Sequence, residues 1–340
     1  MEISKSELLK ALETIKPGLA LTEDLIEQST SFAFVEDQII TYNDNISISY
    51  PFKSKIRGAV SAKELYTLLN KLDSKKDNLS LILKENELRI NAGKEGKAGI
   101  RIEKDVLLPL DEIKTDNKWL KIPKNLIEGL KFCSFSTLKD ESRPLISCVH
   151  VKEDIVESTD NFRATKFYLN KKVKEFLIPA TSIKFLEKFP ATHYNVTKSW
   201  VNFKSKDKAL FSCRILNQEY PDLSGILKVK GKKIKFPDVI KAIEKATIFT
   251  EKEEAFLSAM IEIKMMENKV IIKGEGGVGW YKKVIKTKYK GDYFTFKISS
   301  DFFTTMLKMN NECTLDKNSH RIKFHTNEWE HVVMLIMENE

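Results

Sequence analysis

The stretch ELLKALETI, residues 7–15, recurs twice in the chain with the same order of apolar, small and charged positions. NLIEGLKFC begins at residue 125 and DVIKAIEKA at residue 238, so the copies lie roughly one third of the chain apart. In each copy the apolar residues share one face at helical spacing, as Leu8 and Leu12 do in the first. The pattern predicts three similar amphipathic helices in a chain built from repeats.

A second helical pattern follows each first one. It reads YTLLNKL (66–72), IKFLEKF (183–189) and FTTMLKM (303–309), with a lysine at the same place each time. Amphipathic helices resemble one another by chance, but here both helices of each copy keep a similar separation. We therefore expect three domains with two helices each, over residues 1–117, 118–229 and 230–340.

Strand-like alternation fills the sequence between the predicted helices. LSLILKENELRINA and AMIEIKMMENKVIIKG each read as two strands joined by a short polar turn. Helices that alternate with groups of such hairpins indicate an α+β fold in which the helices pack on antiparallel sheets.

The composition is that of a globular protein. Of 340 residues, 42% are hydrophobic and 31% charged, which excludes disordered and fibrous classes. We find no run of about 18 apolar residues that could span a membrane, and the first residues lack the basic-then-apolar order of a signal peptide. These features predict a cytoplasmic protein without a membrane partner.

The charge favours a polyanionic partner. Lys and Arg number 57 against 48 Asp and Glu, a net charge of +9. A well-solvated surface would also carry such charges, but lysines dominate the polar faces of all six predicted helices, which fits a surface that meets phosphates without reading bases. These helix lysines are Lys10, Lys71, Lys124, Lys131, Lys184, Lys188, Lys241, Lys245 and Lys308.

Residues with catalytic or metal-binding spacing are missing from the sequence. The four cysteines are scattered and read as small core residues, and the five histidines lack ligand spacing. GEGGVGW (274–280) is glycine-rich, but strand-like YKKVIKTKY follows it where a dinucleotide site needs a helix, so we expect a hairpin loop. The sequence predicts no catalytic site, no metal and no cofactor.

Four short motifs resemble those of one known family. ESTDNFRATKF (157–167) is similar to the "TDGHRLA" segment of the bacterial DNA polymerase III β subunit, the sliding clamp. FSCRILNQEYPDLSGIL (211–227) resembles its "LxxGxFPDYxxxLP", RPLISCVHV (143–151) its "RPxLxGVxxE", and HVVMLIM (331–337) its "VVMPM" tail. The resemblance covers nearly the whole chain, in the family's order.

This resemblance implies the DNA-clamp fold and a function without catalysis. Two subunits would form a closed homodimeric ring of six like domains, with helices lining the hole around double-stranded DNA. The ring would hold the DNA without sequence preference and tether the replicative DNA polymerase as a processivity factor. A clamp loader would open it, using ATP that the clamp does not bind.

The resemblance also implies a pocket for a short apolar peptide of partner proteins, at the junction of the second and third domains. Asn161 and Phe162 stand where the family has Gly-His, Ala164 replaces Leu and Leu335 replaces Pro, so the preferred peptide differs. The implied pocket residues are Ile146, Thr159, Asn161, Phe162, Arg163, Ala164, Pro221, Ile226, Val332, Met334 and Leu335.

For the dimer contact, the resemblance implies that Ile100 and Ile102 meet Ile248 and Phe249 of a second subunit; alternatively these are core residues. The basic charge is unusual for this family, and with the lysine- and isoleucine-rich composition it hints at a divergent member encoded by a phage or mobile element.

Two other functions stay open. One is a monomeric clamp-like scaffold for polymerase peptides, and the other is an enzyme acting on nucleic acid.

Overall fold

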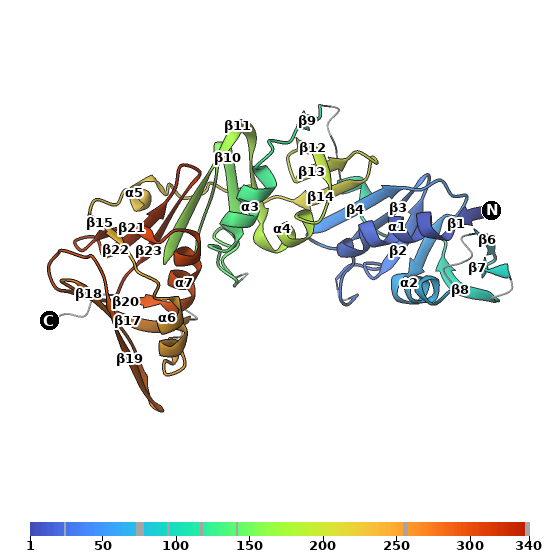
Figure 1. Cartoon of the computed structure of the whole chain (residues 1–340). Helices are drawn as coiled ribbons and strands as arrows, with labels where there is room; N and C mark the ends of the chain where they lie inside the picture. Colours follow the sequence, from blue (N-terminus) through green and yellow to red (C-terminus); the bar gives the residue numbers. More distant parts are fainter. Residues whose placement is uncertain are drawn as a thin grey trace. The chain divides into compact units, whose positions relative to one another are not determined.

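The structure, a computed structural model, describes residues 1–23, 25–72, 78–93, 96–113, 115, 118–140, 142–253 and 258–336. The chain divides into two compact units (Figure 1). Unit 1 comprises Met1–Lys131 and Val173–Gln218, and unit 2 comprises Phe132–Lys172 and Glu219–Glu340. Helix α3 (Leu126–Ser134) and strand β11 (Arg163–Pro179) each contribute residues to both units.

Unit 1 is organised around one antiparallel sheet with the order β1-β6-β7-β8-β5-β2-β3-β4-β14-β13-β12-β9. Its strands are β1 (Glu2–Ser4), β2 (Ser31–Val35), β3 (Gln38–Tyr42), β4 (Ile46–Pro51), β5 (Gly58–Ser61), β6 (Asn78–Lys84), β7 (Glu87–Asn91), β8 (Lys97–Glu103), β9 (Leu120–Lys121), β12 (Ala191–Val196), β13 (Trp200–Ser205) and β14 (Leu210–Arg214). Its helices are α1 (Lys5–Ile15), α2 (Ala62–Lys71) and α4 (Ala180–Leu186), with 3-10 turns at Lys16–Gly18 and Leu110–Glu112.

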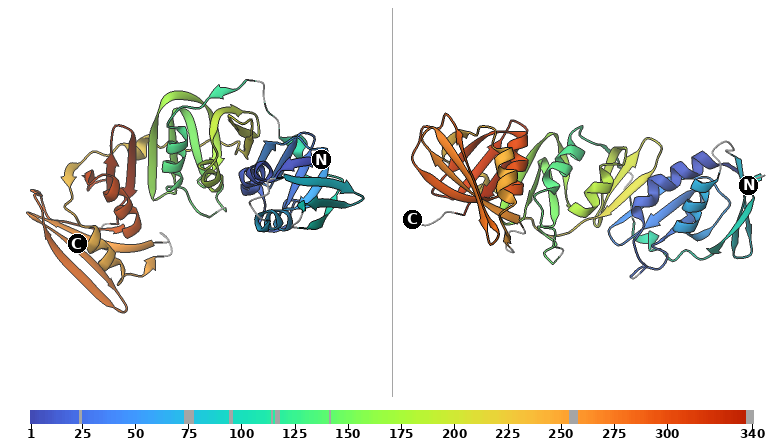
Figure 2. Two further views of the ribbon diagram at one scale, coloured as in Figure 1. Left: turned by 45° about the vertical axis from the view of Figure 1, so that its right-hand side comes forward. Right: turned by 60° about the horizontal axis from the view of Figure 1, so that its bottom comes forward.

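Helix α1 shows why the repeated pattern folds as predicted. The Ser4 side chain accepts a hydrogen bond from the Glu7 backbone N–H and so caps the first turn. Leu8, Leu12 and Ile15 are fully buried, where α1 packs beside α2 and on strands β3 and β4 (Figure 2). Burial of one apolar stripe therefore fixes the helix to its sheet.

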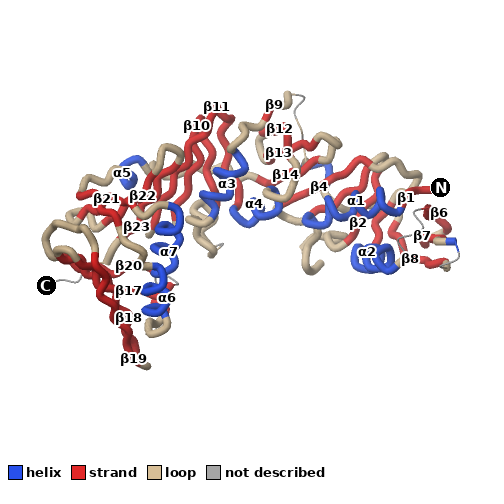
Figure 3. The backbone as a smooth tube through the Cα atoms, viewed as in Figure 1, coloured by secondary structure: helices blue, strands red, loops and turns tan. Residues whose placement is uncertain are grey.

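Unit 2 holds two further antiparallel sheets, ordered β10-β11-β23-β22-β21-β15 and β16-β17-β18-β19, with β20 pairing β17. Helices α6 and α7 pack side by side on the second sheet (Figure 3). Beyond β11 the elements are β10 (Cys148–Thr159), β15 (Lys232–Lys235), β16 (Lys252–Glu253), β17 (Ser258–Met266), β18 (Lys269–Gly276), β19 (Gly279–Lys286), β20 (Phe294–Ser299), β21 (Glu312–Asp316), β22 (Arg321–His325), β23 (Trp329–Met334), α5 (Ser224–Leu227), α6 (Ile240–Thr247) and α7 (Ser300–Met309).

Two expectations about local structure are confirmed in unit 2 and elsewhere. The glycine-rich segment is the hairpin between β18 and β19, with Gly276 paired to Gly279. All four cysteines are buried.

No helix among the described residues is long and apolar enough to cross a membrane, and no three His, Cys, Asp or Glu side chains in that same part of the chain are grouped to hold a metal ion.

The sheets join strands that the sequence assigned to different domains. Strand β14 pairs with β4 in unit 1, and β23 pairs with β11 in unit 2. Backbone groups at the edge of one repeat are thus hydrogen-bonded by the next repeat. The three-domain division stays a prediction, and the junction at residue 117 lies outside the described residues.

The predicted helices exist, but their ends differ from the stretches read in the sequence. Helix α6 begins at Ile240 rather than Asp238. Lys124 lies in a turn before α3, and α4 ends at Leu186, so Lys188 lies in the turn that follows it. The early end of α4 has a physical reason, because the residue before Pro190 is sterically biased away from helical geometry.

Candidate functional site

The turn that joins β10 to β11 is held by Asp160. Its Oδ1 accepts hydrogen bonds from the backbone N–H groups of Phe162 (3.1 Å) and Arg163 (3.0 Å). Asn161 has φ of 76°, in the left-handed region that asparagine tolerates better than most residues. Asn can therefore stand where the similar family motif has glycine, and the chain reverses tightly with Phe162 at the tip.

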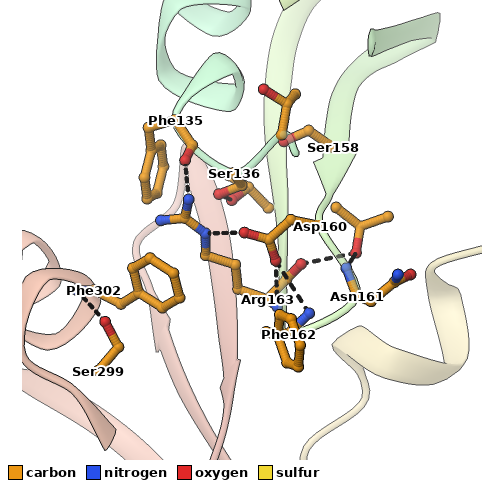
Figure 4. A network of polar contacts seen from close by, with 12 residues as sticks. Phe135, Ser136, Ser158, Asp160, Asn161, Phe162, Arg163, Ser299 and Phe302 are labelled. Carbon is orange, nitrogen blue, oxygen red and sulfur yellow. Dashed lines mark hydrogen bonds and ion pairs between the residues drawn. The ribbon is translucent and has the colours of Figure 1, made fainter. Parts of the chain in front are cut away.

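Arg163 is enclosed by unit 2. Its side chain is 9% exposed, and its Nε donates to Asp160 Oδ2 at 2.8 Å. Figure 4 shows the guanidinium between the rings of Phe135 and Phe302, whose centroids lie 5.0 and 3.7 Å from it, while Nη2 donates to the Phe135 carbonyl. Burial lowers the pKa of Arg163, although the Asp160 charge opposes that shift. The guanidinium fastens the turn to α7 and to the segment after α3.

Tyr220 anchors the second wall. The Thr159 backbone N–H donates to the Tyr220 hydroxyl at 3.0 Å, and Thr159 Oγ1 donates to the Arg163 carbonyl at 2.8 Å. The Tyr220 ring stacks on His150 with centroids 4.9 Å apart, and burial raises the pKa of its hydroxyl. Because Pro221 follows directly, the segment that carries Pro221 and Ile226 is tied to the turn.

Strand β23 supplies the third wall. Ala164 pairs with Val332, and the Met334 backbone N–H donates to the Phe162 carbonyl at 2.8 Å. Arg321, which pairs with Met334 from β22, donates through Nη1 to the carbonyl of Ile226 at 3.4 Å. Three segments far apart in sequence thus meet in unit 2.

The predicted pocket residues divide by exposure. Met334 is 46% exposed, and Phe162 and Ile226 are half-buried. We call the residues that reach the surface the pocket surface: Asn161, Phe162, Pro221, Ile226 and Met334. The buried residues shape its floor and framework: Ile146, Thr159, Arg163, Ala164, Val332 and Leu335.

Sequence reasoning missed three residues that build this site: Tyr220, Arg321 and Lys323. Lys323 Nζ donates to the Leu227 carbonyl at 3.0 Å and lies 2.9 Å from Glu330 Oε2. Tyr220 could have been found from its place directly before Pro221. Arg321 and Lys323 gave no local signal for this contact, because the backbone carbonyls to which they donate lie about 95 residues away.

All nine helix lysines are exposed. Two of them have acidic partners: Lys10 Nζ lies 2.8 Å from Asp207 Oδ2, which raises the pKa of Lys10, and Lys131 pairs with Glu187. The remaining seven form no ion pair with the acids that the structure describes: Lys71, Lys124, Lys184, Lys188, Lys241, Lys245 and Lys308. Such charges are available to phosphates.

The four predicted dimer residues have different environments. Ile248 is 71% exposed after α6, while Phe249 and Ile100 are half-buried. Ile102 is 1% exposed and lies in the core of unit 1, so only its backbone could reach a partner.

No protein-family model matches the sequence, and no curated protein matches it. Solved structures do match. The DNA polymerase III beta chain of Streptococcus pneumoniae is 18% identical, with a TM-score of 0.85 over 99% of each chain. The DNA polymerase sliding clamp of Bacillus subtilis is 15% identical with a TM-score of 0.81, and the beta subunit of Thermotoga maritima is 14% identical with a TM-score of 0.79, each over 99% of both chains.

A structural match at such low sequence identity shows that the fold is shared, but it does not show that the residues of a site are shared. Because the match spans both chains almost completely, it includes the sheets and the helix pairs described above. The chain therefore has the fold of the bacterial DNA polymerase III beta subunits, the sliding clamps, as a divergent example of it.

Proposed function

We propose that this protein is a DNA sliding clamp, a processivity factor that encircles double-stranded DNA as a homodimer and tethers the replicative DNA polymerase. The observation that carries the proposal is the fold itself, which matches sliding clamps from end to end. In this proposal each subunit contributes three clamp domains to a ring of six.

The pocket surface is the proposed tether. Phe162, Ile226 and Met334 offer apolar side chains, and Asn161 offers an amide that can orient a bound backbone. The hydrogen bonds around Asp160 and Tyr220 hold these residues in place before any partner binds. A preorganised surface loses little entropy when a short apolar peptide binds.

The helix lysines are the proposed DNA-facing surface. Lysines without acidic partners neutralise phosphates at any sequence, and contacts of this kind let a protein move along DNA. A clamp loader would open the ring. The protein itself would perform no catalytic step and would need no cofactor.

The ring requires that one subunit's first domain meets the other's third domain. By the sequence resemblance, Ile100 and Ile102 would face Ile248 and Phe249. The high exposure of Ile248 supports this contact, whereas the buried Ile102 would contribute only through the backbone of β8.

The solution mass across a dilution series tests the proposal. A species near twice 39.2 kDa is expected from light scattering after size exclusion. A monomer at every concentration and ionic strength would contradict the ring and favour the monomeric scaffold.

A further inference from the structure

Among the described strands, β8 and β19 both have backbone positions that no neighbouring strand pairs on one side. Strand β8 pairs with β7 over Lys97–Arg101, but pairs with β5 only through Ile102 and Glu103. Strand β19 ends its sheet and pairs with β18 alone. We call these two strands the open edges. Each leaves backbone N–H and C=O groups free to pair with another strand.

The β8 edge is positively charged. Lys97 and Arg101 are exposed and form no ion pair with the described acids. Glu103 accepts a hydrogen bond from Gln28 Nε2 at 2.8 Å. On the neighbouring strand β7, Glu87 lies 2.6 Å from Arg89 and neutralises it. Because the Gln28 amide is neutral, Glu103 keeps its charge, so the described part of β8 carries two unpaired cations, Lys97 and Arg101, against one anion.

The β19 edge carries the same sign more strongly. Lys282, Lys283 and Lys286 are all exposed. Lys286 lies opposite Lys269 in the β18–β19 ladder, so two like charges already face each other there. The acid nearest in the ladder, Glu275, is paired with Lys273.

Apolar side chains on the β19 edge supply the opposing attraction. Trp280 is 64% and Val284 52% exposed, and Ile248 protrudes nearby at the end of α6, which packs against β19. Their burial would favour association by the hydrophobic effect. Glu251 lies beside the hairpin between β18 and β19, but the exposed lysines of β19 outnumber it, so the edge has a net positive charge. An apolar edge with net positive charge binds a second edge of the same sign more tightly when salt screens the charge.

We infer that like charge opposes closure of the dimer through β8 of one subunit and β19 of the other, an inference that rests on the proposed ring. The dimer dissociation constant should therefore fall as ionic strength rises. Residues opposite each other on adjoining strands lie about 5 Å apart, and like charges there are destabilising. The Debye length falls from roughly 14 Å at about 0.05 M salt to roughly 4 Å at about 0.5 M. Interfaces whose charges are complementary weaken over that range.

The dimer dissociation constant, measured by sedimentation equilibrium at both salt concentrations, tests this inference. It is expected to fall about tenfold between about 0.05 M and about 0.5 M NaCl. At the lower salt, the dimer dissociation constant of the variant Lys282→Glu with Lys286→Glu is expected to be about tenfold below that of the natural protein. It is expected to rise as salt is added.

Salt also strengthens apolar association, so a charge-matched control is needed. Lys198→Glu with Lys208→Glu makes the same change in net charge at exposed lysines of unit 1 away from both open edges. It should keep the natural salt dependence. Two results would overturn the inference while leaving the ring intact. One is a dimer dissociation constant that does not change with salt concentration. The other is a control variant whose dissociation constant at the lower salt falls as much as that of the Lys282 and Lys286 variant. Monomers of every variant at every salt concentration would overturn the inference and the ring together.

Discussion

The pocket surface and the helix lysines are built in opposite ways. Around the pocket surface, Asp160, Arg163 and Tyr220 are buried and fully occupied by hydrogen bonds, ion pairs and ring contacts. The helix lysines are exposed, and most have no acidic partner among the described residues.

This difference matches two kinds of recognition. A site that selects one peptide benefits from side chains fixed before binding. A surface that must accept any DNA sequence needs charge, but no fixed geometry. Changes to the buried residues around the pocket surface should therefore affect stability, changes to the pocket surface itself should affect peptide binding, and changes to the helix lysines should affect affinity for DNA.

The largest expected effect concerns DNA. Replacing four unpaired helix lysines by glutamate should weaken duplex binding about a thousandfold near 0.1 M salt, because each lost phosphate contact removes about one unit of salt slope. Fluorescence anisotropy with a labelled duplex measures this. The substitutions are Lys71→Glu, Lys188→Glu, Lys241→Glu and Lys308→Glu.

A control with equal charge separates position from net charge. Four exposed lysines outside the helices are changed in it, and affinity should fall far less. Equal losses in both variants would mean that the helices are not the DNA surface. The control substitutions are Lys104→Glu, Lys198→Glu, Lys208→Glu and Lys290→Glu.

Arg163→Ala should lower the free energy of unfolding of unit 2 by about 3 to 5 kcal/mol. The change leaves the buried Asp160 carboxylate without its cation. Urea unfolding followed by tryptophan fluorescence measures it. Arg163→Lys, which keeps the charge without the forked contacts, should lose about half as much. If Arg163→Ala unfolds at the same urea concentration as the natural protein, the enclosed guanidinium does not stabilise the turn.

Phe162→Ala with Met334→Ala should weaken peptide binding about a hundredfold, because apolar anchors dominate such contacts. The probe is a fluorescein-labelled pentapeptide of apolar residues. Stability should change little, since both side chains reach the surface. Tyr293→Ala with Met309→Ala, two similarly exposed residues of unit 2, is the matched control. Unfolding of the first variant would place Phe162 and Met334 in the core instead.

The smallest expected effect is a pH dependence of unit 2. Burial, with the Arg163 charge adding to it, lowers the pKa of His331 well below its ordinary 6.5. On acidification the unfolded chain takes up this proton first, so stability is lost as pH falls below about 6.5, by up to about 1.4 kcal/mol per pH unit. Urea unfolding from about pH 7.5 to 5.5 measures the slope. In His331→Asn the slope should be shallower by that amount, and an unchanged slope would contradict the prediction.

The sequence predicted the helices well because their signal is local. The spacing of Leu8, Leu12 and Ile15 alone indicates which face of α1 is buried. The order of sheet strands could not be predicted in this way, since pairs such as β4 with β14 join residues far apart in the chain.

The pocket could be predicted only in part, and for the same reason. The motif TDNFR located the turn, and resemblance supplied the other two walls. That Arg163 is enclosed depends on Phe302, whose position relative to the turn no local pattern encodes. Met334 and Arg163 therefore looked equivalent in sequence, yet one is exposed and the other buried.

Retention on DNA with blocked ends tests encirclement most directly. The protein is mixed with a linear duplex, both ends are then closed with bulky protein blocks, and the mixture is gel-filtered at high salt, which releases simple ionic contacts. A sliding clamp should stay with the DNA and leave it only after a restriction enzyme cuts the duplex. Protein that elutes separately from the uncut, blocked DNA would contradict encirclement.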